Sequence, residues 1–118
     1  MNETRARQLV AAERVRVESM LAGVAGEIRT DGSLQSQQTG EYADAGSTVQ
    51  AETVALTLEA DLRRQLGDVA RAEERIDMGT YGRSVDSGAP IPDARLEVEP
   101  LAERTVEEQT LLESATRR

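Results

Sequence analysis

The residue types available for chemistry set a first limit on what this chain does. Histidine, cysteine and lysine are all absent from its 118 residues. These side chains supply most general bases and covalent nucleophiles, so the serine and threonine hydroxyls have no basic partner to activate them. The chain also contains no glycine-rich phosphate-binding loop. We therefore expect a binding protein and not an enzyme.

Hydroxyls and carboxylates are the polar groups that remain, and one spacing of them is informative. Thr105 and Glu108 stand three residues apart, in the pattern of a capping box. In such a box each side chain bonds the other residue's backbone N–H at the start of a helix. One carboxylate among hydroxyls is not a zinc site, because structural zinc takes four thiolate, imidazole or carboxylate ligands. The sequence therefore predicts a helix over residues 106–118 and no bound metal.

Composition favours long exposed helices over a large globular core. Aromatic residues make up 2% of the chain and charged residues 31%, as in helices with solvent-exposed faces. The formal net charge of -8 argues against direct nucleic-acid binding and against an anionic membrane surface. The chain lacks both an apolar run of about 20 residues and a signal-peptide pattern. We expect a cytoplasmic monomer that binds neither nucleic acid nor membranes.

Two stretches have the apolar periodicity of long helices. The first covers residues 3–29 and is expected to end at the turn-forming residues 30–33. The second covers residues 48–78, with a capping box at residues 47–50 and a stop at Gly79. The apolar stripes consist of Val10, Val17, Leu21, Val24 and Ile28, and of Ala55, Leu58, Leu62, Leu66, Val69, Ala72 and Ile76.

These two helices predict an antiparallel coiled-coil hairpin over residues 1–78, with a tip at about residues 30–47. The tip contains Glu41 and Asp44 and no basic residue. Carboxylates at the end of a rigid hairpin could approach a basic channel, a bound magnesium ion or an arginine-bearing loop. Alternatively, the two acids only keep a loop soluble and cap the next helix.

Residues 79–109 read GTYGRSVDSGAPIPDARLEVEPLAERTVEEQ and resemble the zinc-finger lobe of the DksA/TraR family of bacterial transcription factors. The family pattern is approximately GxYGxCxxCGxxIPxxRLxxxPxAxxCxxCQ, and it aligns here without a gap. The four cysteine positions carry Ser84, Ser87, Thr105 and Glu108. The matching residues are Gly79, Tyr81, Gly82, Gly88, Ile91, Pro92, Arg95, Leu96, Pro100, Ala102 and Gln109.

This resemblance implies an all-α fold in which residues 79–118 form a metal-free lobe with a short C-terminal helix. We expect Thr105 and Glu108 to replace the zinc in part, as a helix cap, and Ser84 and Ser87 to be small polar surface residues. The terminal helix is expected to fold back on the lobe or on the base of the hairpin, and Arg95 to tie the lobe together. Apolar packing should come from Tyr81, Ile91, Leu96, Val98, Leu101, Val106 and Leu112.

The resemblance also implies a partner. In the family the hairpin enters the secondary channel of bacterial RNA polymerase, with an acidic DxxDxA motif at its tip. Here the corresponding polymerase-binding tip would be Glu41, Asp44, Ala45 and Gly46, where Glu41 replaces the first acid and Gly46 the alanine.

The resemblance predicts that this protein regulates transcription initiation. Family members often act with ppGpp, but neither Arg83 nor Arg95 is assigned to that nucleotide. The alternative is a non-catalytic coiled-coil scaffold that binds another helical protein.

Overall fold

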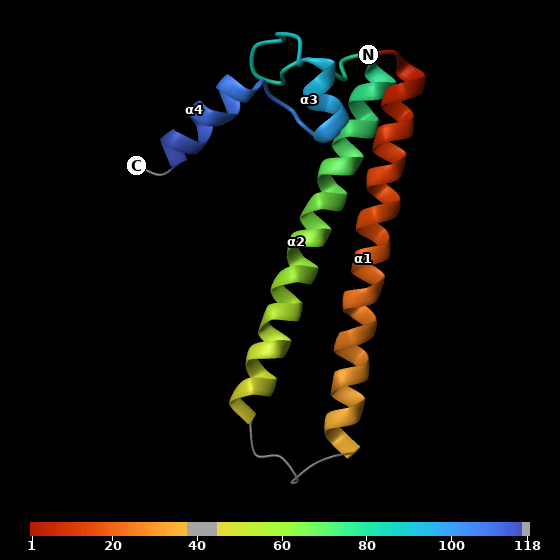
Figure 1. The fold of residues 1–118 in the computed structure, drawn as a ribbon, viewed down its shortest axis with the longest axis vertical. Helices are drawn as coiled ribbons and strands as arrows, with labels where there is room; N and C mark the ends of the chain where they lie inside the picture. Colours follow the sequence, from red (N-terminus) through yellow and green to blue (C-terminus); the bar gives the residue numbers. More distant parts are fainter. Residues whose placement is uncertain (38–44, 117–118) are drawn as a thin grey trace. The chain divides into compact units, whose positions relative to one another are not determined.

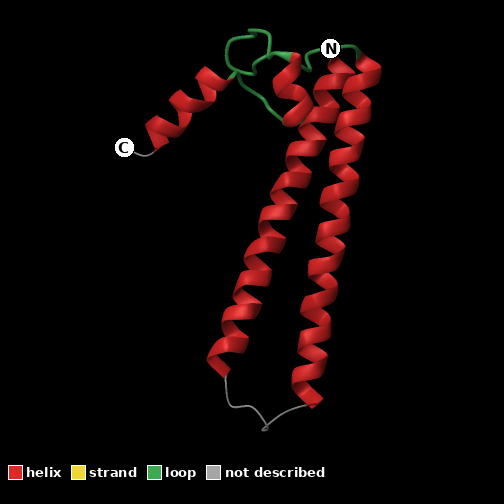
Figure 2. Cartoon of the chain, viewed as in Figure 1, coloured by secondary structure: helices red, strands yellow, loops and turns green. Residues whose placement is uncertain are grey.

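The computed structural model describes the backbone of residues 1–37 and 45–116, and the side chains of residues 1–26 and 49–116. Over these residues the chain forms helices and no strand (Figures 1 and 2). The helices are α1 (Glu3–Gln37), α2 (Ala45–Met78), α3 (Asp93–Val98) and α4 (Val106–Thr116). The predicted all-α fold, a helical hairpin followed by a small lobe and a short C-terminal helix, is confirmed.

Both long helices extend further toward the tip than the sequence predicts. The predicted end of the first helix at residues 30–33 is wrong, because α1 continues to Gln37. The predicted cap at residues 47–50 is also wrong, because α2 begins at Ala45 and Ser47 lies inside it. Helix propensity is a weak prior, and lengthening an existing helix needs no new nucleation. Glycine and serine therefore did not end these helices.

Residues Arg14–Gly67 form one compact unit, which contains α1 from Arg14 onward and α2 as far as Gly67. Its core consists of Val17, Val24 and Leu62, with three partly buried neighbours in Leu21, Ala55 and Leu66. Arg16 flanks this core and donates from Nη2 to Oε1 of Gln65 at 3.2 Å. Burial of these side chains from water is the main stabilisation of the paired helices.

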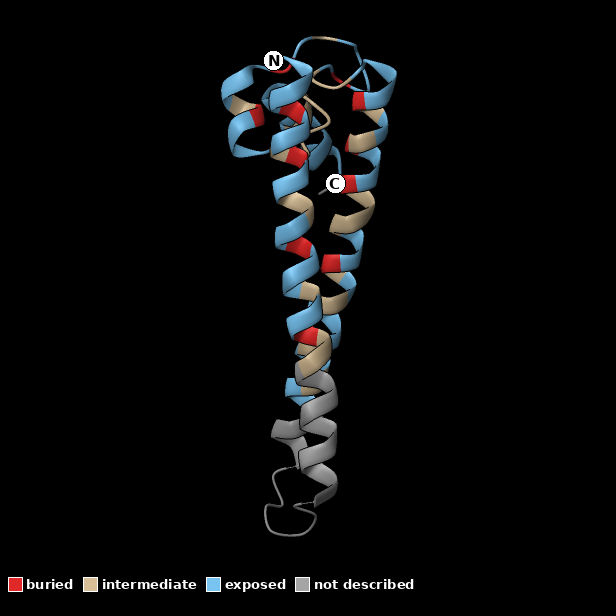
Figure 3. Ribbon diagram, turned by 90° about the vertical axis from the view of Figure 1, so that its right-hand side faces the viewer, coloured by how far each residue is buried: buried red, intermediate tan, exposed pale blue. Residues whose placement is uncertain are grey.

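The apolar stripes are confirmed at most positions in both helices. Figure 3 shows buried residues recurring along each helix. Leu58 is an exception, since 39% of its surface is exposed. Ile28 lies outside the described side chains.

The second compact unit contains Met1–Glu13 and Asp68–Arg118. Its core is formed by Ala6 and Val10 of α1 and by Val69, Ala72 and Ile76 of α2. Tyr81 and Leu101 pack against this cluster. The lobe is therefore built onto the first turns of α1 and the last turns of α2. The predicted domain division between residues 78 and 79 stays a prediction.

Candidate functional site

The lobe begins where α2 ends, at the predicted stop. Gly79 has a φ of 75°, a left-handed conformation that favours glycine. The N–H groups of Thr80 and Tyr81 then donate to the carbonyl of Arg75 at 2.8 and 3.1 Å. These bonds satisfy a carbonyl that the end of the helix would leave without a partner. The chain thereby turns out of α2 and into the lobe.

Ser84 occupies the first of the four family cysteine positions and organises a tight turn. Its Oγ accepts the N–H groups of Asp86 at 3.1 Å and Ser87 at 3.3 Å. Its backbone N–H donates to Ala89 O at 2.8 Å, and its carbonyl accepts from Gly88 N at 2.9 Å. Only 5% of Ser84 is exposed. The prediction that it is a surface residue is therefore wrong.

Ser87 occupies the second position and is exposed, as predicted. It is nevertheless bonded, because its Oγ accepts the N–H of Ala89 at 3.2 Å. Both serine oxygens thus accept backbone N–H groups, which leaves both hydroxyl protons free to be donated elsewhere.

Thr105 and Glu108 occupy the remaining two positions and form the predicted capping box. Thr105 N–H donates to Oε1 of Glu108 at 3.0 Å, and Glu108 N–H donates to Oγ1 of Thr105 at 3.2 Å. The Thr105 hydroxyl also donates to Oε1 of Glu108, at 2.9 Å. α4 accordingly begins at Val106. Both residues are partly buried.

The surroundings of Glu108 favour its charged form. Its pKa is lowered to about 2, first by the Thr105 N–H and next by the hydroxyls of Ser87 and Ser84. Hydrogen bonds to the charged form of a carboxyl group favour that form. Glu108 is therefore ionised at neutral pH, and it forms hydrogen bonds with Thr105 at the start of α4.

Three further contacts join the turn at residues 84–89 to the segment before α4. Val85 N–H donates to Glu103 O at 2.9 Å. Arg104 Nε donates to Asp86 Oδ2 at 2.7 Å, and this pairing raises the pKa of Arg104. Arg95 Nε donates to Arg104 O at 3.1 Å. The predicted role of Arg95 in tying the lobe together is thus confirmed.

The donor set of this lobe does not fit zinc. Three neutral hydroxyls and one carboxylate replace the thiolates, and the chain contains neither cysteine nor histidine. Among the described residues, no group of three or more acidic, cysteine or histidine side chains is placed to hold a metal ion. In the described residues, the contacts that stabilise the lobe are hydrogen bonds and apolar packing.

The packing of the lobe agrees with the sequence in part. Ile91 and Leu96 are buried, with 4% and 1% exposed, and Tyr81 donates its hydroxyl to Pro100 O at 2.7 Å. Three predicted packing residues, Val98, Val106 and Leu112, are instead exposed by 80%, 53% and 44%.

The terminal helix departs from its predicted packing. Over Val106–Thr116, α4 contributes no buried residue. The prediction that it folds back on the lobe or on the hairpin is therefore wrong. Its capping box gives α4 a defined start without side-chain burial.

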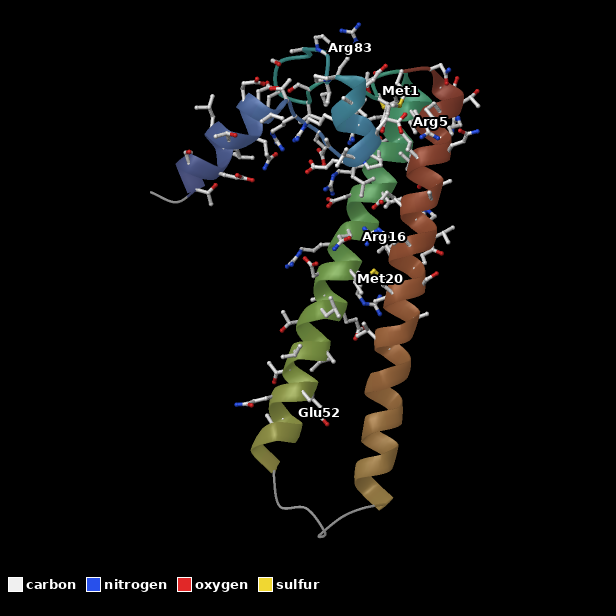
Figure 4. The ribbon with its side chains drawn as sticks, viewed as in Figure 1. Met1, Arg5, Arg16, Met20, Glu52 and Arg83 are labelled. Carbon is white, nitrogen blue, oxygen red and sulfur yellow. The ribbon has the colours of Figure 1, made fainter. Side chains whose placement is uncertain are left out.

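Two charged groups at the start of the chain, the Met1 ammonium and the Arg5 guanidinium (both residues are labelled in Figure 4), contact α3. Arg5 binds Glu97 through Nε at 2.9 Å and Nη2 at 2.6 Å, a two-bond geometry that carboxylates favour. This contact lowers the pKa of Glu97. The Met1 ammonium lies 3.0 Å from Asp93 Oδ1. Neither contact has a sequence signal, because the paired residues are about 90 positions apart.

The basic residues near the lobe form hydrogen bonds or ion pairs with lobe residues. Arg83 is exposed (Figure 4) and donates from Nη1 to Gly88 O at 3.3 Å. Arg71 Nε and Arg75 Nη1 lie 3.3 and 3.9 Å from the carboxylate of Glu103. No pattern in the sequence predicts Glu103 as this shared partner.

The predicted tip lies largely outside the described residues. Glu41 and Asp44 belong to residues 38–44, and Ala45 and Gly46 are the first residues of α2. The polymerase-binding role of all four stays a prediction. None of the described helices is long and apolar enough to cross a membrane.

Comparison with solved structures shows which known fold the chain adopts. The structure resembles that of transcription factor DksA2 from Pseudomonas aeruginosa, with a TM-score of 0.82 and 25% sequence identity. The alignment covers 98% of this chain and 86% of that chain. The chain therefore has a DksA-like fold, in which none of the four positions that correspond to the zinc ligands of the family pattern carries a cysteine.

Comparison by sequence gives one further relative. The chain is 33% identical over 104 residues to general stress protein 16O of Bacillus subtilis (strain 168). The match covers 88% of this chain but 60% of the length of that protein. No family model matches the chain.

Proposed function

We propose that this protein regulates transcription by binding RNA polymerase and inserting its helical hairpin into the secondary channel. The observation that carries this proposal is the likeness to transcription factor DksA2 over 98% of the chain. Fold alone does not fix function, so the proposal also relies on the hairpin and on its acidic tip.

The hairpin suits insertion into a channel. α1 and α2 contain 35 and 34 residues, so each helix is about 50 Å long at 1.5 Å per residue. Their apolar side chains are directed toward each other at Val17, Val24 and Leu62. The exposed sides are rich in charged residues, so the hairpin can lie in a hydrated channel.

The tip acids are the groups that we propose to act in the polymerase. Glu41 and Asp44, followed by Ala45 and Gly46, would approach arginine side chains or the catalytic magnesium of the polymerase. The protein would act as a cytoplasmic monomer, without catalysis and without direct contact to DNA. The net charge of -8 supports a protein partner over a nucleic acid. We assign no role to ppGpp.

The proposal is tested by binding to core RNA polymerase and by transcription in vitro from a stable-RNA promoter. We expect the wild type to bind and to change initiation, and Glu41→Ala/Asp44→Ala to bind without changing it. The control is Glu74→Ala/Glu107→Ala, which removes two exposed acids outside the tip and should behave as the wild type. Absence of wild-type binding would refute the proposal.

A second candidate function is docking to another helical protein. Apolar side chains are exposed on the hairpin itself at Val15, Val54 and Leu56, by 65%, 67% and 56%. Exposed apolar side chains of this kind can form a contact surface, although single ones are common on soluble proteins. Loss of activity in Val15→Ser/Val54→Ser, with full activity in Glu41→Ala/Asp44→Ala, would favour this function over the first.

A further inference from the structure

We propose that free molecules of this protein pair with each other through one face of α2, with the second copy of the chain packed antiparallel against it. The residues of this outer face recur at steps of four, three and four positions, so they share one side of the helix. They are Val49, Thr53, Leu56 and Ala60, and all are exposed. Pairing would cover apolar surface that the single chain leaves in water.

The outer face is separate from the seam that joins α2 to α1. Leu62 marks the seam, because it packs in the core with residues of α1. Leu56 stands six positions earlier and so lies about 120° around the helix from Leu62. The exposed fraction is 56% for Leu56 and 59% for Val49, which lies two turns away on the same side. Large apolar side chains exposed on neighbouring turns of one helix are typical of a contact surface.

The polar groups of the outer face already have partners within the helix. The Thr53 hydroxyl donates to Val49 O at 2.8 Å. Thr57, at the border of the face, donates in the same way to Thr53 O at 2.8 Å. Hydroxyls bonded to the preceding turn need no water as acceptor, so covering them leaves no donor without a partner. The face contains no charged residue, and its burial therefore has a low desolvation cost.

The charges beside the outer face select a second, antiparallel copy as its occupant. Glu52 (labelled in Figure 4) and Arg63 lie eleven positions apart, which is about three turns, so both flank the face on the same side. An antiparallel copy reverses their order and places Glu52 of each molecule opposite Arg63 of the other, whereas a parallel copy would not. Arg63 also pairs with Glu59 of its own chain at 2.8 Å, but a guanidinium has five donors and can bond both.

The same geometry gives the pair a two-fold axis. Leu56 lies close to the midpoint between Glu52 and Arg63, so the two copies of Leu56 would meet near the axis. A contact of this kind is isologous, because each molecule contributes the same patch, and it closes at two copies. The outer face therefore predicts a dimer and no larger assembly.

Pairing has a consequence for activity, and this consequence alone rests on the proposed function. α2 is one arm of the hairpin that we propose to enter the secondary channel. A second hairpin against its outer face has to leave before the arm can enter. The dimer is thus a reserve form and the monomer is the acting form. A variant that cannot pair should change transcription at a lower protein concentration than the wild type.

Analytical ultracentrifugation of the full chain without polymerase measures the pairing itself, from micromolar to millimolar concentration. We expect the wild type to change from monomer to dimer over this range. Leu56→Asp should raise the dissociation constant about tenfold or more, because it places two carboxylates at the centre of the contact. Val54→Asp is the matched control, since Val54 is 67% exposed in the same helix but lies about 160° around it from Leu56. Circular dichroism checks that both variants are folded.

Charge exchange tests the antiparallel arrangement. Glu52→Arg and Arg63→Glu should each weaken self-association about tenfold, because each sets like charges against each other at both ends of the contact. An equimolar mixture of the two variants should pair as the wild type does, since both ends then combine opposite charges.

Three results would overturn the proposal. The first is a wild type that stays monomeric over the whole concentration range. The second is equal self-association of Leu56→Asp and Val54→Asp, and the third is a mixture of charge variants that pairs no better than either variant alone. A monomeric wild type whose effect on transcription is lost in Leu56→Asp would assign the outer face to another occupant. Because self-association is measured without polymerase, its absence is distinguishable from failure of the proposed function.

Discussion

The turn around Ser84 shows how much of the lobe depends on single hydroxyl groups. Ser84 Oγ accepts two backbone N–H groups inside the lobe, whereas Ser87 Oγ accepts one at the surface. A buried donor without a partner costs more free energy than an exposed one, because water cannot replace the lost bond. The two serines therefore differ in importance despite their equivalent positions in the zinc-finger pattern.

This difference predicts the effects of two matched substitutions. Ser84→Ala should lower the free energy of unfolding by about 1–3 kcal/mol, since it removes the shared acceptor of two N–H groups whose hydrogen bonds are partly buried. Ser87→Ala should cost less than about 1 kcal/mol, because its partner can bond water. Urea denaturation of both variants measures the difference. Equal losses would show that Ser84 does not organise the turn.

Glu108 predicts how the stability of the lobe depends on pH. Its pKa in the folded protein is about 2, against an ordinary value of 4.5. A lowered pKa contributes stability that is fully present above the unfolded value and is lost as the pH falls toward the folded value. The contribution of Glu108 should therefore disappear between about pH 5 and pH 2.

Urea unfolding of the wild type, Glu108→Gln and Glu107→Gln over this pH range tests that prediction. Glu108→Gln should flatten the pH dependence, and Glu107→Gln should leave it unchanged. Some dependence should remain in both variants, because the pKa values of Asp61 and Glu97 are also lowered by arginine contacts. A Glu108→Gln profile as steep as that of the wild type would contradict the assignment.

At the scale of single residues, the sequence predicted local contacts and missed distant ones. The capping box of Thr105 and Glu108 was predictable, because both partners lie within one helical turn. The burial of Ser84 was not, because no sequence pattern shows that Glu103 approaches this turn, where it accepts the N–H of Val85. The pairing of Arg5 with Glu97 has the same origin.

At the scale of elements, the paired long helices are stabilised by a narrow apolar seam. Leu62 of α2 is 1% exposed and packs in the core with Val17 and Val24. Leu56 lies in the same helix, with 56% of its surface exposed. Substituting each leucine by alanine therefore compares the effect of a buried and an exposed leucine on the free energy of unfolding.

Leu62→Ala should lower the free energy of unfolding by about 2–5 kcal/mol, because it removes buried methyl groups and leaves a cavity. Leu56→Ala should change it by about 0.5 kcal/mol or less, as is usual at exposed positions. Denaturant unfolding followed by circular dichroism provides both values. Similar losses in the two variants would mean that the seam is placed wrongly.

The periodicity of the long helices was easier to predict than their ends. Repeats of seven residues placed Leu62, Val69 and Ile76 correctly in the buried stripe. The ends were missed because turn-forming residues weaken a helix by about 1 kcal/mol or less each, which neighbouring residues can offset. The apolar residues of α4 were misplaced for another reason, since exposed apolar side chains are common on soluble proteins.

At the scale of the whole molecule, the fold is that of a DksA-like transcription factor built without zinc ligands. The likeness in fold covers 98% of the chain, while the Bacillus relative is matched over 60% of its length. The fold and the lobe were predictable because the glycine, proline and arginine residues of the family lobe pattern are present, although its cysteines are not. The role of the tip was inferred only from the resemblance, and it stays a prediction.

Insertion of the hairpin into RNA polymerase is the central claim, and the absence of cysteine makes it directly measurable. Tyr42→Cys would carry a photo-activated cross-linker between the two tip acids, as the single thiol of the protein. Val98→Cys, at a lobe position that is 80% exposed, would carry the same reagent as a control. Both labelled proteins would be irradiated with core RNA polymerase.

We predict that the Tyr42→Cys probe cross-links to the walls of the secondary channel close to the catalytic centre. The Val98→Cys probe should cross-link outside the channel or not at all. A tip probe that binds polymerase but reacts only with its outer surface would contradict the claim, as would the absence of any cross-link to polymerase.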